Sequence, residues 1–131
     1  MTVALATVVA AVQVLALTVS GVKQAPDSLP SIISTEATIL TYPESGRVIS
    51  NSSGFATELH TIAMDIMVGG IDIGQIYEKG AGILGLLIRK IEENPTLGGT
   101  VETYEDITYL FEIEKLMWTI KINGVKILHT W

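Results

Sequence analysis

Few residues in this chain have the types and spacing that metal binding or catalysis requires. The two histidines, His60 and His129, have no cysteine near them, because the 131-residue chain contains none. Neither has the close cluster of ligands that a metal site needs, so we interpret both as hydrogen-bonded or exposed side chains. The run VGGIDIG at 68–74 lacks the spacing of phosphate-binding turns, and GxSxG does not occur. We therefore expect no metal, no cofactor and no catalytic residue.

Acidic residues are the remaining candidates for chemistry. They gather at Glu102, Glu105 and Asp106, and again at Glu112 and Glu114. Paired carboxylates carry out acid–base catalysis when a pocket raises the pKa of one of them. These residues lie in polar stretches, which favours a solvated acidic surface.

Composition limits the classes of protein that the chain can belong to. Its length allows one domain with its own hydrophobic core. The net charge of −6 argues against attraction to nucleic acid, since phosphate binding depends on Lys and Arg. Only 17% of residues are charged and 48% are apolar, which suits a chain that buries surface in an assembly or in a membrane.

The apolar stretch Val3 to Val19 decides between those two environments. It is at the lower limit of length for a membrane-spanning helix. A signal peptide needs a basic residue before its apolar run, and here no Lys or Arg precedes Lys23. We predict a buried helix over 2–20. Two prolines then predict an extended connector over 21–31.

The middle of the chain predicts strands over 32–68 and a helix over 72–94. TYPESG at 41–46 contains a turn signal, and the polar run at 47–54 reads as an exposed loop between two strands. Phe55 to Val68 then alternates as a strand does. Asp72 can cap the second helix, and Asn94 with Pro95 ends it.

The last third predicts strands over 100–131. The apolar phase changes near Glu114 and Lys115, which indicates a bulge or a break. Asn123 and Gly124 predict a two-residue hairpin turn. The element order gives an α+β fold: a single domain with a mainly antiparallel sheet packed by two helices.

Two sequence runs carry a resemblance to a known group of proteins. They are GVKQAPDSLP at 21–30, after the first helix, and NPTLGGTV at 94–101, at the end of the second helix. In this order of elements the chain resembles the small neck and tail-completion proteins of tailed bacteriophages, and among them it is most similar to the tail terminators. This resemblance implies a structural virion protein, assembled in the host cytoplasm, with no catalytic residues.

The resemblance also implies partners. It implies a homo-hexameric ring that caps the tail tube, ends its polymerisation and joins the tail to the neck. The partners are then other copies of the chain, the tail tube protein and a neck or connector protein. DNA passes through the ring without specific binding, and no membrane is involved.

Two sets of residues are our candidates for contacts in such a ring. We predict that Ser45 to Phe55 forms a mobile contact arm, with Arg47, Asn51 and Phe55 as its contact residues. We predict that Glu102, Glu105 and Asp106 form an acidic cluster that faces the lumen or a neighbouring copy.

Other functions stay open at this point. The main alternative is another ring-forming neck component, such as a head-completion or connector protein. A tube subunit is disfavoured because it needs long sheets that close a continuous inner barrel. A small enzyme or ligand-binding domain is the alternative from a different class, and a secreted or membrane-anchored protein using Val3 to Val19 is a further one.

Overall fold

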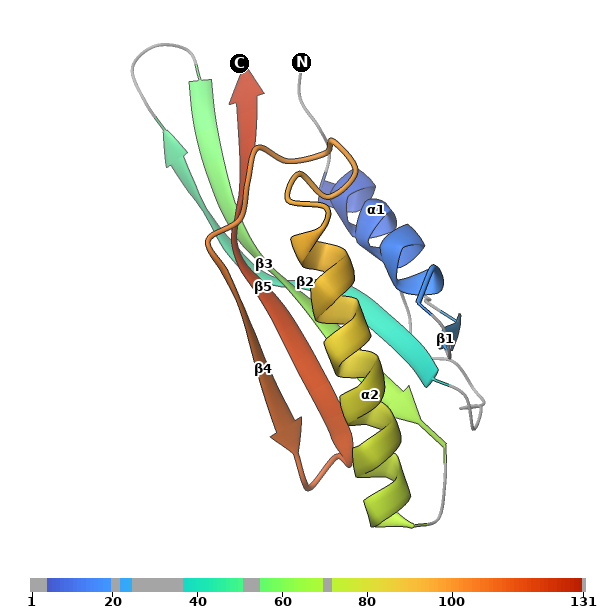
Figure 1. Ribbon diagram of the computed structural model, residues 1–131. Coiled ribbons are helices and arrows are strands. Elements are labelled where there is room, and N and C mark those ends of the chain that lie inside the picture. The colour runs from blue at the N-terminus through green and yellow to red at the C-terminus, as the bar shows by residue number, and fades with distance from the viewer. Residues whose placement is uncertain (1–4, 20–21, 25–36, 51–54, 70–71, 131) are drawn as a thin grey trace.

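The chain folds into one layer of strands covered by one layer of helices. Its structure is a computed structural model that describes residues 5–19, 22–24, 37–50, 55–69 and 72–130. The elements in these ranges are α1 (Leu5–Leu17), β1 (Val22–Gln24), β2 (Ala37–Ser50), β3 (Phe55–Val68), α2 (Ile73–Glu92), β4 (Asp106–Glu112) and β5 (Met117–Thr130). Both helices lie on the same face of the sheet (Figure 1). The predicted α+β domain is confirmed.

The sheet has the strand order β1-β2-β3-β5-β4. β2, β3, β5 and β4 pair antiparallel, and β1 pairs parallel with β2 only at Ala37 and Thr38. β2, β3 and β5 have 14 residues each, far more than the about 5 to 6 residues of a typical strand. One end of the β2–β3 hairpin, together with the end of β5, therefore projects beyond both helices (Figure 1).

The turn predicted at TYPESG is wrong, because β2 continues through it to Ser50. Glu44 is the extra residue of a β-bulge between Pro43, which pairs with Ile62, and Ser45, which pairs with Thr61. A bulge accommodates the turn-forming residues without reversing the chain, and the missing N–H of Pro43 is tolerated near the edge of a sheet. Arg47 to Ser50 are consequently strand and not loop. Residues 51–54 lie outside the described residues.

The hairpin predicted at Asn123 and Gly124 is also wrong. β5 continues through both residues, and the reversal between β4 and β5 lies at 113–116, where the apolar phase changes. Both Asn123 and Gly124 lie opposite Thr61, which makes them a second bulge. Gly124 has φ +64°, the left-handed conformation that a bulge glycine adopts. The same conformation serves hairpin turns, so the local signal was ambiguous.

The core lies between the helices and one face of the sheet. Strands place alternate side chains on opposite faces, and the helix-side positions of the strands are buried. They are Ile39 of β2; Ile62, Met64 and Ile66 of β3; and Trp118, Ile120 and Ile122 of β5. α1 adds Val8, Val12 and Ala16, and α2 adds Leu84, Leu87 and Ile91. At Gly80 of α2 a Cβ would lie 2.6 Å from Cδ1 of Trp118, so this glycine permits close packing.

The boundaries of α2 follow its capping residues. Asp72 is the N-cap, and its carboxylate accepts a hydrogen bond of 2.9 Å from the backbone N–H of Gly74. After the helix, Leu97, Gly98 and Gly99 have positive φ and turn the chain back, with Leu97 buried in the core. The predicted cap and stop are confirmed. Strand pairing after the turn begins with an isolated bridge from Thr103 to Lys126, and β4 begins only at Asp106.

The N-terminal apolar stretch packs as a helix of the core. Val8, Val9, Val12 and Ala16 of α1 are buried. Residues 2–4 and 20 of the predicted helix lie outside the described residues, as do 25–36, which contain most of the predicted connector. Within the described ranges, no helix is both long and apolar enough to cross a membrane.

Candidate protein-interaction surface

The face of the sheet opposite the helices, which we call the open face, carries a polar network. Its centre is Asp65, whose side chain is on the opposite side of β3 from Met64 and Ile66. Asp65 is 7% exposed, and its Oδ1 accepts hydrogen bonds from Thr119 Oγ1 at 2.9 Å and from Tyr42 Oη at 3.3 Å. Burial raises the pKa of Tyr42 to about 12, and the negative charge and hydrogen bond of Asp65 add to this effect. The network holds a buried carboxylate between two hydroxyl groups.

Two further contacts extend the polar surface of the open face. Lys121 forms an ion pair of 2.9 Å with Glu44, the bulged residue of β2. The Asn123 side-chain amide donates to Asp106 Oδ1 at 2.9 Å and to Thr108 Oγ1 at 3.0 Å. These contacts are exposed, so each contributes little to stability. They orient the polar side chains of β2, β4 and β5 toward one another.

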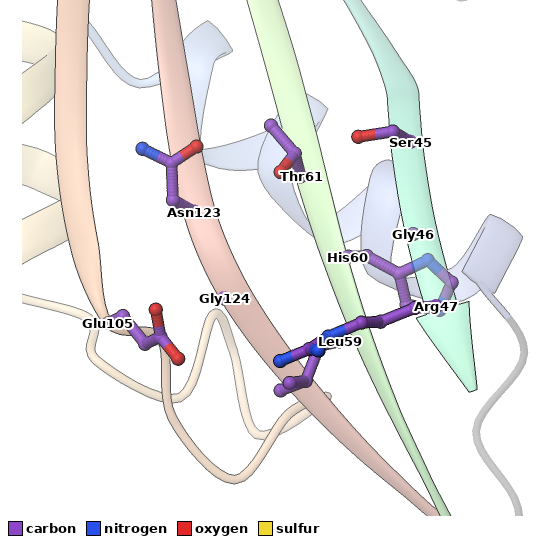
Figure 2. A pocket seen from close by; sticks show the side chains of 9 residues that line it. All are labelled: Ser45, Gly46, Arg47, Leu59, His60, Thr61, Glu105, Asn123 and Gly124. Carbon is purple, nitrogen blue, oxygen red and sulfur yellow. The ribbon is translucent and has the colours of Figure 1, made fainter. Parts of the chain in front are cut away.

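A shallow cavity of about 340 Å³ lies on the open face where the two bulges meet. Figure 2 shows Arg47 on its β2 side and Glu105 on its β4 side, with Thr61 and Asn123 between them. Side chains of the protein pack against both glycines of the cavity. A Cβ at Gly46 would overlap the imidazole of His60, and a Cβ at Gly124 would overlap the side chain of Glu105.

His60 lies beside a carboxylate of its own strand. His60 is buried and its Nε2 lies 2.9 Å from Oε1 of Glu58, so the predicted hydrogen-bonded histidine is confirmed at this position. In the parts of the chain that the structure describes, no three His, Asp or Glu residues are close enough to hold a metal ion. What the surface offers is polar and apolar contact area.

The predicted contact arm is a β-hairpin. Arg47 is exposed in β2, Asn51 lies outside the described residues, and Phe55 is the first residue of β3. Val48 and Ile49 are 58% and 45% exposed, although both are large apolar residues. Our sequence interpretation did not name these two residues. Their position as two apolar residues within a polar run was the sequence signal that could have identified them as contact residues.

The predicted acidic residues are exposed, but each has a different neighbour along β5. Glu102 forms an ion pair of 3.3 Å with Lys126, and Asp106 accepts from the amide of Asn123. Glu105 packs over Gly124. They form an acidic row along the outer side of β5 and β4. Whether this row faces a lumen or a neighbour stays a prediction.

A partly exposed aromatic cluster, which the sequence interpretation missed, joins α2 to β4 and β5. The ring of Tyr77 lies 5.1 Å from that of Phe111 in an edge-to-face arrangement, and Trp118 Nε1 donates to the Tyr77 carbonyl at 3.2 Å. The ring of Tyr109 lies 6.0 Å from that of Trp118, yet 58% of Tyr109 is exposed. Leu110, on the open face, and Ile113 are also exposed. Exposed apolar side chains concentrated at a sheet edge are typical of an interaction surface.

No known protein-family model and no curated protein matches this chain.

Proposed function

We propose that this protein is a structural virion protein, a tail terminator whose copies form a ring that caps the tail tube, ends its polymerisation and joins the tail to the neck. The likeness of 21–30 and 94–101 to tail-completion proteins supports this function. The α+β domain supports it as well, because the resemblance implies that fold. In this proposal the protein assembles in the host cytoplasm and functions in the virion.

The observation that carries the proposal is a sheet with two open edges. Within the described residues, β4 has no strand on its outer side, and β2 pairs with β1 only at Ala37 and Thr38. Open edges with exposed apolar residues favour pairing with another chain. An interface between two different edges of identical subunits is head-to-tail, and it closes into a ring when the rotation allows.

The projecting hairpin supports contact with the tube. Val48 and Ile49 are exposed near the end of β2. In the proposed ring they bury their apolar surface against the tube protein. The net charge of −6 supports a ring through which DNA slides without binding.

A tube subunit is the second candidate. The sequence interpretation disfavoured it because a tube subunit needs long sheets that close a continuous inner barrel. The 14-residue strands β2, β3 and β5 favour the length that such a sheet needs. The remaining alternative within the same class is a head-completion or connector protein, which also forms rings.

Imaging with purified tail tubes separates these functions. The mass of the full-length protein is measured in solution, and the protein is then mixed with tubes and with capsids for negative-stain microscopy. A closed ring bound at one tube end supports the terminator. Growth into tubes supports the tube subunit, and rings bound only at capsid portals support a connector.

The role of the hairpin is tested by charged variants. The double variant V48D/I49D should form the ring but lose tube binding, because two aspartates cannot be buried in an apolar contact. Leu86→Asp is the matched control, since Leu86 is exposed on α2 away from the hairpin. Undiminished tube capping by V48D/I49D would exclude this hairpin as the tube contact.

A further inference from the structure

An apolar groove of about 440 Å³ lies between α1 and the outer side of β2. Val9, Ala10 and Gln13 of α1 form one wall, and Thr41 and Pro43 of β2 form the other. This groove is on the helix side of the sheet, so it is separate from the cavity of Figure 2. It lies at the β2 edge, where β1 does not reach.

A large aromatic side chain is exposed at the opposite edge. Tyr109 is on the helix side of β4, because it pairs with Ile120, which points into the core. Within the described residues, no strand covers β4 on its outer side. The ring of Tyr109 is therefore largely exposed at the rim of the sheet.

The groove and Tyr109 lie on the same cross-strand row. Tyr109 pairs with Ile120, Ile120 pairs with Met64, and Met64 pairs with Thr41. All four positions are on the helix side of the sheet. Tyr109 of one copy and Thr41 of another are thus at the same height and on the same face, at opposite edges of the sheet.

The strand directions also match. Three successive antiparallel pairings separate β2 from β4, so β4 runs antiparallel to β2. Rotating a copy about an axis along the strands preserves this relation. Without a shift along the strands, it brings β4 as far as Phe111 beside the part of the neighbour's β2 that β1 leaves open. Tyr109 then enters beneath α1, where Gln13 offers an amide to its hydroxyl.

We propose that the groove between α1 and β2 receives Tyr109 from the β4 edge of a second copy, in a head-to-tail interface that continues the sheet from subunit to subunit. This inference rests on the proposed ring and specifies its subunit contact. Leu110 follows Tyr109 on the open side and meets Leu40 of the neighbouring copy. The apolar area at both edges is buried in this way.

Charges near the two edges are complementary. The β4 side carries the acidic row of Glu102, Glu105 and Asp106, and the β2 side carries Arg47 at a similar height. Arg47 is exposed, and no carboxylate among the described residues lies within ion-pair distance of it. Glu44, the acid of the β2 side, already pairs with Lys121 of its own chain. Glu102 is likewise paired with Lys126 of its own chain, so the next copy brings Glu105 and Asp106, which have no ion-pair partner among the described residues, toward Arg47.

Two single variants of the full chain test the interface from its two sides. Tyr109→Ala removes the inserted ring and leaves the groove intact. Ala10→Trp fills the groove from an exposed position of α1 and leaves Tyr109 intact. Each should weaken self-association roughly 30-fold or more, as loss of a central aromatic contact does. Leu86→Ala, an exposed apolar residue of α2, and Tyr109→Phe should stay within a few-fold of wild type.

Mixing the two defective variants is the decisive measurement. An equimolar mixture should form heterodimers and stop there, because only the Tyr109 of the Ala10→Trp chain and the groove of the Tyr109→Ala chain are functional. Sedimentation velocity gives the masses, and circular dichroism checks that each variant is folded. A symmetric interface would not give this complementation.

Several outcomes would overturn the inference. They are a wild type that remains monomeric at the highest attainable concentration, single variants that assemble as wild type does, and a mixture that stays monomeric. Failure of the proposed function looks different, because heterodimers would then form while wild-type assemblies ignore tail tubes. Rings that cap tubes but tolerate both variants would leave the function standing and exclude this interface.

Discussion

The two faces of the central sheet are built from the same strands but are stabilised by different interactions. On the helix side, Met64 and Ile120 are fully buried and apolar. On the open face, Asp65 and Thr119 are also buried, at 7% and 4% exposure, but they hydrogen-bond to each other. The helix side depends on shape and apolar area, whereas the open face also depends on hydrogen bonds among its buried polar side chains. Burial alone therefore does not identify the core of this protein.

The largest effect should come from a cavity on the helix side. Ile120→Ala should lower the free energy of unfolding by about 2–5 kcal/mol, because the helices cannot close the space that the side chain leaves. Chemical denaturation measures the loss. Lys121→Ala, the next residue of β5 on the open face, is the control and should cost less than about 1 kcal/mol. Equal losses would contradict the distinction between the faces.

The second effect concerns the charge at the centre of the open face. Asp65→Asn should cost about 1–3 kcal/mol, because two hydroxyl donors lose a charged acceptor. Glu44→Gln, which changes an exposed ion pair, should change the free energy of unfolding by about 1 kcal/mol or less. Denaturation of both variants at neutral pH compares them. A larger loss for Glu44→Gln would show that exposed ion pairs hold this face.

The third effect is a difference in stability between alanine substitutions at two glycines of α2. Gly80→Ala should destabilise by about 1–3 kcal/mol, because its new methyl group overlaps Trp118. Gly82→Ala places its methyl group in open space and should stabilise the helix by up to about 1 kcal/mol. Thermal unfolding monitored by circular dichroism gives both values. Opposite signs are expected, and the same sign for both would argue against close packing at Gly80.

The smallest effect is on pH dependence at the open face. Tyr42→Phe should cost about 1 kcal/mol at neutral pH. The pKa of Tyr42 rises from 10.0 to about 12 on folding, so its contribution is fully present below pH 10 and is lost as the pH rises toward 12. The advantage of wild type over Tyr42→Phe should therefore shrink across that interval. Thr119→Val, which removes no titrating group, should keep the pH dependence of wild type.

The sequence predicted the elements of this fold better than their connections. Period-two alternation located β3 from Phe55 to Val68, and Asp72 and Asn94 marked the limits of α2. The turn-forming residues at 43–46 and 123–124 led to wrong predictions, because a bulge and a turn use the same residue types and, at Gly124, the same left-handed conformation. Only the pairing partner, Ile62 in one case and Thr61 in the other, distinguishes them.

The candidate surface was predicted in part. Arg47 and the acidic residues were identified as exposed charges, which local polarity is sufficient to indicate. Asp65 had a visible signal, a charge in the middle of the apolar run TIAMDIMV. No sequence signal identified Tyr109 as exposed. Alternation placed it on the same face as Phe111, but it could not indicate that β4 is an edge strand.

By itself, the sequence determined which residues are apolar and where β3 and the two helices lie. Those properties are local, because they depend on side-chain period and on capping residues. Strand order, the two bulges and the row that connects Tyr109 to Thr41 were decided only by the tertiary structure. They depend on which strands meet across the sheet, and residues far apart in the chain set that pairing together.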